Sequence, residues 1–412
     1  MNIFPMVNIM PSKLAIIFIM LIIISGCAGA KKIAGDRYLL EKNTIFKNNQ
    51  ELPNDPIKFL LVDKPNKKIL GIPIKRNIHS LAGSNSDSLF NEWLGRKENR
   101  KKLLNNWLSS KQVRELGRYK SKLNNWLKNS GEAPVFLDST SILKNVNRLK
   151  QFYINKGYFD TKVFSKNSLG IDRKAEVKYF IETGKQYTID SITKKINSSA
   201  LDSLYESSLT ESLIQKGYPF EIDRFEAERS RLINLFRNKG VYNFQQNSIQ
   251  FTAAIDSSGA DTKIPVVIEI NDLQKRENDT LINFPYRIHP VSKINIYIDT
   301  PGQLGQLSSF MDSINYNDFN LFFKGKLKYK PKALEEVIFI KKGEAYSDLE
   351  RSQTYRYISN LRNFKYPSII FKPIGKSSDL EANIFLSPKE RFSMGFDLDF
   401  SHSNIQDFGF SL

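Results

Sequence analysis

Two hydrophobic periods alternate along the chain, one typical of helices and one typical of strands. Beyond residue 130, three segments share one plan: an aspartate, an amphipathic helix pattern, a polar turn with an aromatic residue, and a strand pattern. Within each helix pattern, apolar residues recur every three or four positions, which places them on one face. The segments begin at residues 134–138, 217–223 and 343–348. This self-similarity predicts a degenerate internal repeat.

Both ends of each predicted helix carry informative residues. The first two helices run into Asn155-Lys156-Gly157 and Asn238-Lys239-Gly240. Glycine accommodates the left-handed backbone that often follows a last helical turn. In the third repeat we align Lys365 with these glycines, so we expect that helix to end differently or with some strain. Aspartates are expected to cap free backbone amides at the three helix starts: Asp138, Asp223 and Asp348.

Strand patterns surround each helical segment. Alternating apolar and polar residues at 175–182, 265–270 and 380–386 predict a strand with one buried face after each helix. Two further strands, at 186–192 and 291–298, are predicted to open the second and third repeats. The order is strand, helix, helix, strand, strand. It predicts an α+β fold in which two helices cover one face of a three-stranded sheet.

The region before the first repeat motif has a weaker pattern. Short apolar runs at 59–62 and 69–74, broken by prolines, read as strand-like pieces. Residues 89–129 read as helix, because leucines and tryptophans recur at helical spacing. We expect Trp107 and Trp126 to pack in a core or between helices.

The first thirty residues have the composition of a targeting segment. An apolar run at 14–24 follows Lys13 and is too short to span a bilayer comfortably, but it matches a signal-peptide core. Small residues stand directly before Cys27, the only cysteine of the chain. The segment resembles a bacterial lipoprotein signal, which implies diacylation of the Cys27 sulfur. The alternative is an ordinary secretory signal with an incidental cysteine. Residues 28–29 lack the acidic residue of inner-membrane retention, which favours the outer membrane by analogy.

Composition and charge narrow the classes of partner. Hydrophobic residues make up 41% of the 412 residues, which excludes a fully disordered chain. The 61 Lys and Arg residues exceed the 43 Asp and Glu residues, giving a formal charge of +18. A basic surface can meet nucleic acid, anionic lipid or acidic polymer. The secretion signal argues against nucleic acid.

The sequence lacks the usual signatures of catalysis. It contains no phosphate-binding glycine loop, no zinc-protease motif and no nucleophile elbow. One cysteine excludes a disulfide framework, and the three histidines lie far apart, which makes a zinc site improbable. We therefore expect no enzymatic activity, no catalytic residue, no metal and no cofactor.

The repeated helix ending, the strand that follows it and the unit order resemble polypeptide-transport-associated (POTRA) domains. These are the periplasmic repeats of the BamA/TamA superfamily of outer-membrane assembly proteins. The lipobox, the long insertion in the first unit and residues 134–138 resemble the TamA-like lipoproteins (TamL type) of Bacteroidetes. The resemblance implies a signal peptide, three POTRA-like units, the first with a helical insertion, and the first strand or strands of a transmembrane β-barrel, at residues 1–26, 27–184, 185–284, 285–390 and 391–412.

The resemblance also implies a function. The chain is expected to be the periplasmic arm of an assembly or translocation factor, lipid-anchored in the outer membrane, that binds unfolded β-barrel clients. POTRA-like sheets have an exposed edge to which a client strand adds by β-augmentation. Our candidate edges are the strands that follow Gly157 and Gly240. A periplasm-spanning partner of the TamB type is implied as well.

Two predictions have alternatives, one for the C-terminal segment and one for the function. Residues 391–402 and 407–412 alternate like barrel strands, but they also fit a final soluble edge strand. A complete barrel needs many more strands, so we expect this segment to be a truncated start. The alternative function is a lipid-anchored envelope adapter without insertase activity. A two-partner secretion transporter ranks lower, because those usually have two POTRA units and no lipid anchor.

Overall fold

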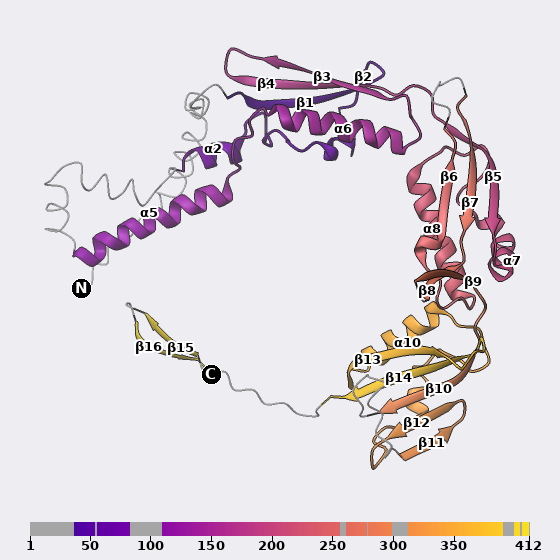
Figure 1. The fold of residues 1–412 in the computed structure, drawn as a ribbon. Helices are drawn as coiled ribbons and strands as arrows, with labels where there is room; N and C mark the ends of the chain where they lie inside the picture. Colours follow the sequence, from indigo (N-terminus) through magenta and orange to yellow (C-terminus); the bar gives the residue numbers. More distant parts are fainter. Residues whose placement is uncertain are drawn as a thin grey trace, which may run out of the picture. The chain divides into compact units, whose positions relative to one another are not determined.

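The chain folds into two compact units, Met1–Tyr187 and Thr188–Leu412. The computed structural model describes residues 37–53, 56–82, 109–255, 261–277, 279–298 and 312–389, and the backbone of 399–403 and 406–411. The first unit holds one α+β repeat and the second holds two (Figure 1). The α+β prediction is confirmed. We call the repeats 1, 2 and 3, built on the sheets that begin with β1, β5 and β10.

Repeat 1 is a four-stranded mixed sheet with a long helix. Its elements are β1 (Leu39–Lys47), β2 (Gln50–Glu51), α6 (Ser139–Asn155), β3 (Lys162–Leu169) and β4 (Lys174–Glu182). The strand order is β2-β1-β4-β3, with β1 parallel to β4 and β3 antiparallel to it.

One face of this sheet packs against α6. Leu149 and Tyr153 of the helix share a buried core with Val177, Tyr179 and Ile181 of β4. These three strand residues alternate with exposed or half-buried ones, which is the period predicted for a sheet with one wet face. Burying each large apolar side chain stabilises the fold by about 1.5–3 kcal/mol.

The rest of repeat 1 is helical. A 3₁₀ turn, η2 (Pro56–Leu60), and two helices, α2 (Ile74–Ser80) and α5 (Ser110–Ser130), stand between β2 and α6. The strand-like prediction for 59–62 and 69–74 is therefore wrong, apart from an isolated Ile69–Ile72 bridge. The helix predicted at 89–129 is confirmed from Ser110 onward, and its earlier part lies outside the described residues.

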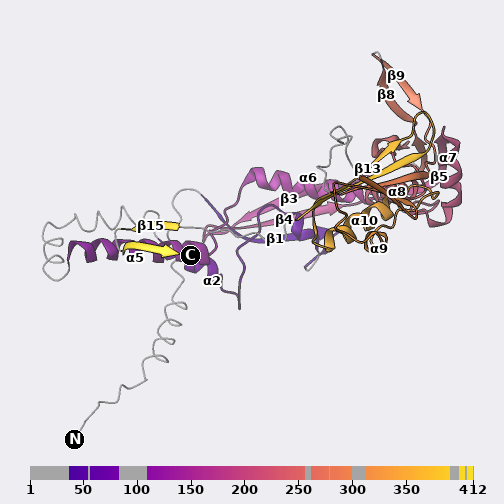
Figure 2. The same ribbon diagram turned by 90° about the horizontal axis from the view of Figure 1, so that it is seen from below.

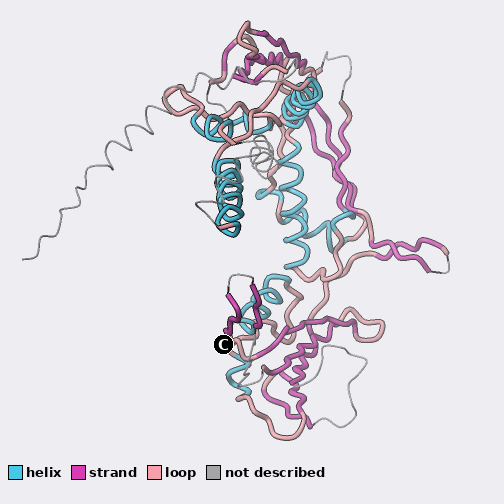
Figure 3. The backbone as a smooth tube through the Cα atoms, turned by 90° about the vertical axis from the view of Figure 1, so that its left-hand side faces the viewer, coloured by secondary structure: helices cyan, strands magenta, loops and turns pink. Residues whose placement is uncertain are grey.

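Repeat 2 has the simplest form of the predicted unit. Its elements are β5 (Thr188–Ile196), α7 (Ser199–Ser207), α8 (Ile222–Asn238), β6 (Ile249–Ala253) and β7 (Lys263–Ile270). Two short 3₁₀ turns interrupt the connections: η3 (Leu209–Glu211) and η4 (Gln246–Ser248). The order is β5-β7-β6, with β5 parallel to β7. Figure 3 shows its helices on one side of the strands.

A hairpin that the sequence analysis missed follows repeat 2. Strands β8 (Leu273–Glu277) and β9 (Thr280–Phe284) pair with each other and with no other described strand. Figure 2 shows this hairpin projecting from its repeat.

Repeat 3 is a five-stranded sheet in the order β11-β12-β10-β14-β13. Its repeat elements are β10 (Val291–Ile298), α10 (Asp348–Asn360), β13 (Phe364–Pro373) and β14 (Leu380–Pro388). Inserted elements stand between β10 and α10: β11 (Asp312–Tyr316), β12 (Phe319–Phe323) and α9 (Pro331–Glu335). The three-stranded prediction thus holds for repeat 2 and is wrong for repeats 1 and 3, because their added strands lengthen the sheet.

A β-bulge recurs at one position of the first strand in all three repeats. The register against the central strand shifts between Leu40 and Lys42, between Ile189 and Ser191, and between Val291 and Lys293. The extra residues are Glu41, Asp190 and Ser292. Because a bulge fixes register and twist locally, its recurrence aligns the three repeats residue by residue.

The helix caps agree with the prediction only in part. Asp138 caps α6 by accepting from the N–H groups of Thr140 and Ser141. The prediction is wrong for Asp223 and Asp348. Glu221 occupies the cap position of α8, but its side chain accepts no hydrogen bond from the first backbone amides, and Ser347 caps α10.

The helix ends confirm the glycine prediction and correct one alignment. Gly157 and Gly240 have φ of 83° and 106°. In repeat 3 the left-handed residue is Arg362, with φ of 54°, and not Lys365. Helix α10 ends at Asn360, so Asn360-Leu361-Arg362 corresponds to Asn155-Lys156-Gly157. The expected strain is present, because a side chain occupies a left-handed position.

Trp126 and the two C-terminal strands lie outside the three repeat sheets. Trp126 is 58% exposed on α5, so the core-packing prediction is wrong for it; Trp107 lies outside the described residues. Near the C-terminus, β15 (Asp399–Ser403) and β16 (Gln406–Ser411) form a two-stranded antiparallel sheet. Among the helices that the structure describes, none is both long and apolar enough to cross a membrane.

Candidate functional site

The sheet edges carry the candidate binding surfaces. The predicted edge strands, those after Gly157 and Gly240, are β3 and β6, and both stand at the end of their sheets. Their edge position is confirmed. In repeat 3 the corresponding edge strand is β13. An edge strand presents unpaired N–H and C=O groups that can pair with another chain.

Strand β3 is the most regular of these edges. Its eight residues pair with β4 without a register shift, from Lys162 opposite Glu182 to Leu169 opposite Ala175. It contains no proline. Its outer face carries Phe164, which is 41% exposed and stacks on Phe180 of β4 at 5.2 Å between ring centroids.

The other two edges are less suited to strand addition. Strand β6 has five residues, and the guanidinium of Arg229 lies 5.3 Å from the ring centroid of Phe251. Strand β13 has a register shift between Lys365 and Ser368 and contains two prolines, Pro367 and Pro373. Bulges and prolines are devices that blunt an edge against pairing.

Each first strand, β1, β5 or β10, also has an outer edge, which faces away from the central strand of its sheet. The segment before the long helix covers the first part of this edge in every repeat. Leu40 donates its N–H to the carbonyl of Val135 at 2.8 Å, and Ile189 donates to Tyr218 at 2.9 Å. In repeat 3 the donor is Val291 and the acceptor is Glu344, at 2.8 Å. The starts of the three repeat motifs in the sequence are therefore short segments that cover this edge.

The second part of this edge differs between the repeats. In repeat 1 the β1–β2 hairpin covers it, and Leu52 donates its N–H to the carbonyl of Ile45 at 2.8 Å. In repeat 3, β12 runs parallel to β10 and covers it from Ile294 to Tyr297. In repeat 2, β7 is the one described strand that pairs with β5, so no described strand covers the outer edge over 191–196.

A hollow of about 420 Å³ lies beside this open part of β5. Strand β5, helix α7, the η3 turn and the segment after it all contribute to its wall. We call it the β5 hollow, and its lining residues are Ile192, Lys194, Tyr205, Glu206, Leu209, Ser212, Ile214, Gln215 and Lys216. The wall combines apolar side chains with two lysines and the carboxylate of Glu206, which pairs with Lys194.

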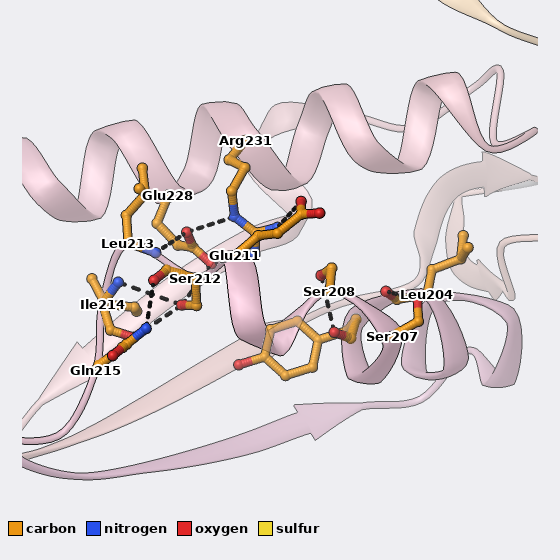
Figure 4. Close-up of polar contacts among 11 residues, drawn as sticks. Leu204, Ser207, Ser208, Glu211, Ser212, Leu213, Ile214, Gln215, Glu228 and Arg231 are labelled. Carbon is orange, nitrogen blue, oxygen red and sulfur yellow. Dashed lines mark hydrogen bonds and ion pairs between the residues drawn. The ribbon is translucent and has the colours of Figure 1, made fainter.

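A buried carboxylate holds one wall of the β5 hollow in place (Figure 4). Glu228 of α8 is fully buried, and accepts from the Ser212 hydroxyl at 3.1 Å and from the Leu213 N–H at 2.9 Å. Arg231 donates to both of its oxygens, at 2.7 and 2.8 Å. These bonds raise the pKa of Arg231. A charge so deeply buried is tolerated because it is paired and hydrogen-bonded.

The opposite wall carries a second charged cluster. Lys194 of β5 pairs with Asp202 of α7 at 2.5 Å and with Glu206. The hydrogen bonds to Asp202 and Glu206 raise the pKa of Lys194. Burial raises the pKa of the neighbouring Tyr205 to about 12, so its hydroxyl stays protonated at neutral pH.

On the face of each sheet away from the helices, the residue pair at one equivalent position differs in chemistry between the repeats. Phe46 stacks on Phe180 in repeat 1 with ring centroids 5.1 Å apart. Tyr297 stacks on Phe385 at 4.9 Å in repeat 3. The same position in repeat 2 is an ion pair of Lys195 with Glu269 at 2.7 Å. Only repeats 1 and 3 thus present aromatic rows at this position.

The predicted lipidation residue, Cys27, lies outside the described residues. Over the described parts of the chain, no three His, Cys, Asp or Glu side chains gather as a metal-binding group would. The sequence analysis found the two edges from the glycine motifs. It missed the β5 hollow, which depends on Lys194 and Glu228, two charged residues with no distinctive sequence context.

Comparisons with known proteins give a structural likeness only. No family model and no curated protein matches the sequence. The structure is similar to POTRA domains 3–5 of BamA from Haemophilus influenzae, with 10% identity and a TM-score of 0.32, over 85% of this chain and 96% of that one. It is also similar to POTRA domains 1–3 of Omp85 from Anabaena, with 8% identity and a TM-score of 0.25, over 86% and 97%.

A third similar structure is the N-terminal domain of Omp85 from Thermosynechococcus elongatus, with 10% identity and a TM-score of 0.20, over 63% of this chain and 88% of that one. TM-scores this low add no weight to a functional conclusion. The proposals below therefore rest on the repeats and edges of this chain.

Proposed function

We propose that the chain is the periplasmic POTRA arm of an outer-membrane protein assembly or translocation factor, and that it binds extended client strands at open sheet edges. The observation that carries the proposal is the edge of β3: eight residues in unbroken register, without proline, at the end of the sheet. The plan that the three repeats share supports it: a first strand parallel to the last strand, helices between the two, and an antiparallel edge strand beside the last one.

The chemistry of such an edge suits many clients. Main-chain pairing supplies affinity without reading side chains, so unfolded barrel strands of different sequence can add in the same way. Clients of this kind alternate apolar and polar residues. The aromatic row of Phe46, Phe180 and Phe164 offers the outer face of an added strand a stacking surface. No catalytic group is required, and the proposed role is non-enzymatic.

Further parts of the proposal concern membrane attachment and partners. Cys27 is the proposed lipid-anchoring residue, and residues 391–412 are the proposed start of a barrel. A TamB-like periplasm-spanning protein is the proposed docking partner. These features support the TamL type of the BamA/TamA superfamily as the proposed relative. The alternative is a lipid-anchored envelope adapter that uses its basic surface, for which the formal charge of +18 is the supporting observation.

A proline in β3 tests the client-binding proposal. On β1 the helix-facing Leu40 directs its N–H away from β4. Strand β3 runs antiparallel on the other side of β4, so its helix-facing residues, including Ser165, also direct their N–H groups away from β4. Ser165→Pro removes one such donor and leaves the β3–β4 ladder intact. Ser165→Ala, which keeps the N–H, is the matched control.

Binding is measured with full-length protein and fluorescent peptides from unfolded β-barrel proteins. Loss of one hydrogen bond of about 0.5–1.5 kcal/mol predicts about two- to tenfold weaker binding for Ser165→Pro and no change for Ser165→Ala. Equal binding by both variants contradicts client addition at β3. Binding to anionic polymer that disappears at high salt, without any peptide binding, favours the adapter.

A further inference from the structure

Helix α5 presents an apolar stripe to the solvent. The residues of this stripe recur at spacings of three, four and three positions, which places them along one face of the helix over about 15 Å. We call this face the α5 stripe, and it consists of Leu116, Tyr119, Leu123 and Trp126. These residues are 44%, 66%, 58% and 58% exposed. Four large apolar side chains in a row on the surface are more than scattered exposed residues.

The α5 stripe is not the face by which the helix packs within its own unit. At 3.6 residues per turn, Val113 and Asn124 lie on a neighbouring face, and they are 6% and 8% exposed. At its C-terminal end α5 contacts α2 (Figure 1), and the N–H of Glu132 donates to the carbonyl of Lys75 at 3.0 Å. The unit therefore buries one face of α5 and leaves the α5 stripe outside.

The first turn of α5 is closed by its own cap. The Ser109 hydroxyl accepts from the Gln112 N–H at 3.3 Å, and the Gln112 side chain accepts from the Ser109 N–H at 2.8 Å. This reciprocal pair is a capping box, which satisfies two backbone donors at the start of the helix. The apolar stripe is thus presented by a formed helix, which does not have to fold when it binds.

The charge of α5 is strongly positive. Its 21 residues include six Lys or Arg residues and one acidic residue, Glu115, so its formal charge is +5. Glu115 already pairs with Arg118 at 2.7 Å. Lys111 and Lys122 make no ion pair among the described residues, and Nζ of Lys122 lies 5.9 Å from the ring centroid of Tyr119. Lys122 therefore places a cation directly beside the α5 stripe.

This charge limits what can cover the α5 stripe. A second copy of the chain brings another helix of charge +5, and like charges side by side repel. The segment 83–108 of the same chain contains five basic and three acidic residues, so it is positive as well. The occupant therefore has to be both anionic and apolar. A bilayer surface with acidic headgroups has both properties.

Two observations favour a lipid surface over an acidic groove on a protein. The α5 stripe contains a tryptophan and a tyrosine, the residues enriched where a membrane meets water, and a neighbouring lysine can extend its ammonium group to the headgroups. The proposed lipid-anchoring residue, Cys27, precedes Leu39 by twelve residues, which span at most about 43 Å. An acyl chain on Cys27 would therefore hold the unit that contains α5 close to a bilayer.

We propose that α5 lies in the plane of an anionic membrane surface, with the α5 stripe among the acyl chains and its cations at the headgroup phosphates. The inference rests on the proposed function in one respect, the nearness of a membrane. The helix, its stripe and its charge are independent of Cys27 and of client binding at β3. The test therefore follows Trp126 itself, so that a failed anchor and a failed α5 contact are distinguishable.

Trp126 is the natural probe of this contact. The chain has three tryptophans, and Trp93→Phe together with Trp107→Phe leaves Trp126 as the only one. Full-length protein in this background, with Cys27 or with Cys27→Ala, is mixed with vesicles that contain a brominated lipid, which quenches tryptophan among the acyl chains. The vesicles are phosphatidylcholine alone or an equal mixture with phosphatidylglycerol. The apolar run at 14–24 contains no tryptophan and is common to all variants, so it does not contribute to the signal.

On the vesicles with phosphatidylglycerol, we expect quenching of Trp126 in both proteins. In Cys27→Ala, the lipid concentration for half-maximal quenching should be at least about tenfold higher on phosphatidylcholine alone, because the cations then have no anionic headgroups to meet. Quenching that requires Cys27 overturns the proposal, because the acyl chains alone would then explain the contact. A wild type that carries no fatty acid, with quenching retained in Cys27→Ala, would overturn the proposed anchor and support the α5 contact.

Two substitutions to glutamate separate insertion of the stripe from simple charge attraction. Leu123→Glu places a carboxylate on the α5 stripe, and Asn125→Glu places the same charge at an exposed position on the opposite face. We expect Leu123→Glu to raise the half-maximal lipid concentration about tenfold or more, the loss of one buried leucine. Asn125→Glu should change it less than about threefold, because salt screens a charge across the helix. Equal effects of the two substitutions overturn the proposal. Absence of quenching on both kinds of vesicle, the result expected if an acidic protein groove covers the stripe, overturns it too.

Discussion

The side-chain oxygen of Asn238 accepts a 2.9 Å hydrogen bond from the backbone N–H of Leu349. Asn238 is the last residue of α8 in repeat 2, and Leu349 lies in the first turn of α10 in repeat 3. The first amides of a helix have no partner within the helix. Repeat 2 therefore supplies a capping group to the long helix of repeat 3, in addition to the cap by Ser347.

Removing this cap is expected to loosen the start of α10. Asn238→Ala is predicted to destabilise repeat 3 by about 0.5–2 kcal/mol, the range for lost caps, and to increase amide hydrogen exchange around Leu349. Asn360 occupies the same last position of α10, and its side chain has no hydrogen bond among the described residues. Asn360→Ala is therefore the control and should leave stability within about 0.5 kcal/mol. Equal effects of the two substitutions would refute the inter-repeat cap.

Gly240 is a second determinant of the junction between repeats 2 and 3. Its carbonyl accepts from the His289 N–H at 3.0 Å, and a Cβ atom at Gly240 would lie 2.5 Å from Cγ2 of Ile288. Gly217 has a similar backbone, with φ of 84° against 106°, but a Cβ there meets nothing within 4 Å. Alanine at either position has to adopt a left-handed backbone, which costs about 1–2 kcal/mol in both variants.

The clash adds to this strain at Gly240 alone. Gly240→Ala is expected to lose about 1–3 kcal/mol more than Gly217→Ala in chemical denaturation, the range for an overpacked contact. Hydrogen exchange in both variants locates the loss. If Gly217→Ala is as destabilising as Gly240→Ala, close packing at Ile288 does not contribute to the junction.

The elements that were predicted correctly from the sequence are those in which one hydrophobic period continues without interruption. Apolar and polar residues alternate along β4, β7 and β14, and each strand was predicted within two residues of its bounds. Strand β1 was missed because the bulge at Glu41 breaks its alternation and because Lys42 and Asn43 interrupt its apolar residues. A bulge shifts every later side chain to the other face of a simple alternating pattern.

The open edge of β5 was beyond the reach of sequence patterns. Whether the outer edge of a first strand is covered depends on which inserted segments form strands beside it. Strand β2 covers this edge in repeat 1 and β12 covers it in repeat 3, whereas the described residues of repeat 2 contain no such strand. The alignment of the third repeat failed for a different reason. The motif Arg362-Asn363-Phe364 offers an asparagine three residues beyond Asn360, and Arg362 gives no sign that it adopts a left-handed backbone.

The buried pair of Glu228 and Arg231 is expected to contribute strongly to the stability of repeat 2. Glu228→Gln removes the charge and leaves the Arg231 guanidinium, 16% exposed, with Glu211 at 3.9 Å as its carboxylate partner among the described residues. Breaking such a pair costs about 3–5 kcal/mol. Glu226 and Arg229 form an i,i+3 pair on the same helix, but the Glu226 side chain is 56% exposed.

Glu226→Gln is therefore the matched control, with an expected loss of about 0–1 kcal/mol. Thermal or urea denaturation measures both. A loss below about 1 kcal/mol for Glu228→Gln would mean that the buried carboxylate does not hold the wall of the β5 hollow.

Lipid anchoring gives a prediction that does not depend on the repeats. Cys27→Ala should abolish attachment of labelled fatty acid, and the protein should remain unprocessed or leave the membrane fraction. Cys27→Ser, which keeps a small polar side chain, is expected to behave in the same way, because diacylation requires the thiol. Fatty acid that still attaches to Cys27→Ala, with the protein still in the membrane fraction, would disprove the lipobox assignment.

The stability of the junction between repeats 2 and 3 should depend on pH through His289. Its Nδ1 lies 2.6 Å from the Ser378 carbonyl, and its ring packs edge-to-face on Tyr242. Burial, with the positive charge of Arg287, lowers the pKa of His289 below its ordinary value of 6.5. The unfolded chain then binds a proton more readily than the folded one, so the contribution is present above about pH 6.5 and is lost as pH falls toward the folded pKa.

His289→Phe keeps an aromatic ring against Tyr242 and cannot titrate. We expect the stability difference between wild type and His289→Phe to shrink as pH falls from 8 to 5, measured by denaturation in matched buffers. Other titrating groups are common to both proteins and cancel in this difference. A difference that stays constant, or grows as pH falls, would show that protonation of His289 does not weaken the junction, and the hydrogen bond to Ser378 would then be compatible with the charged ring.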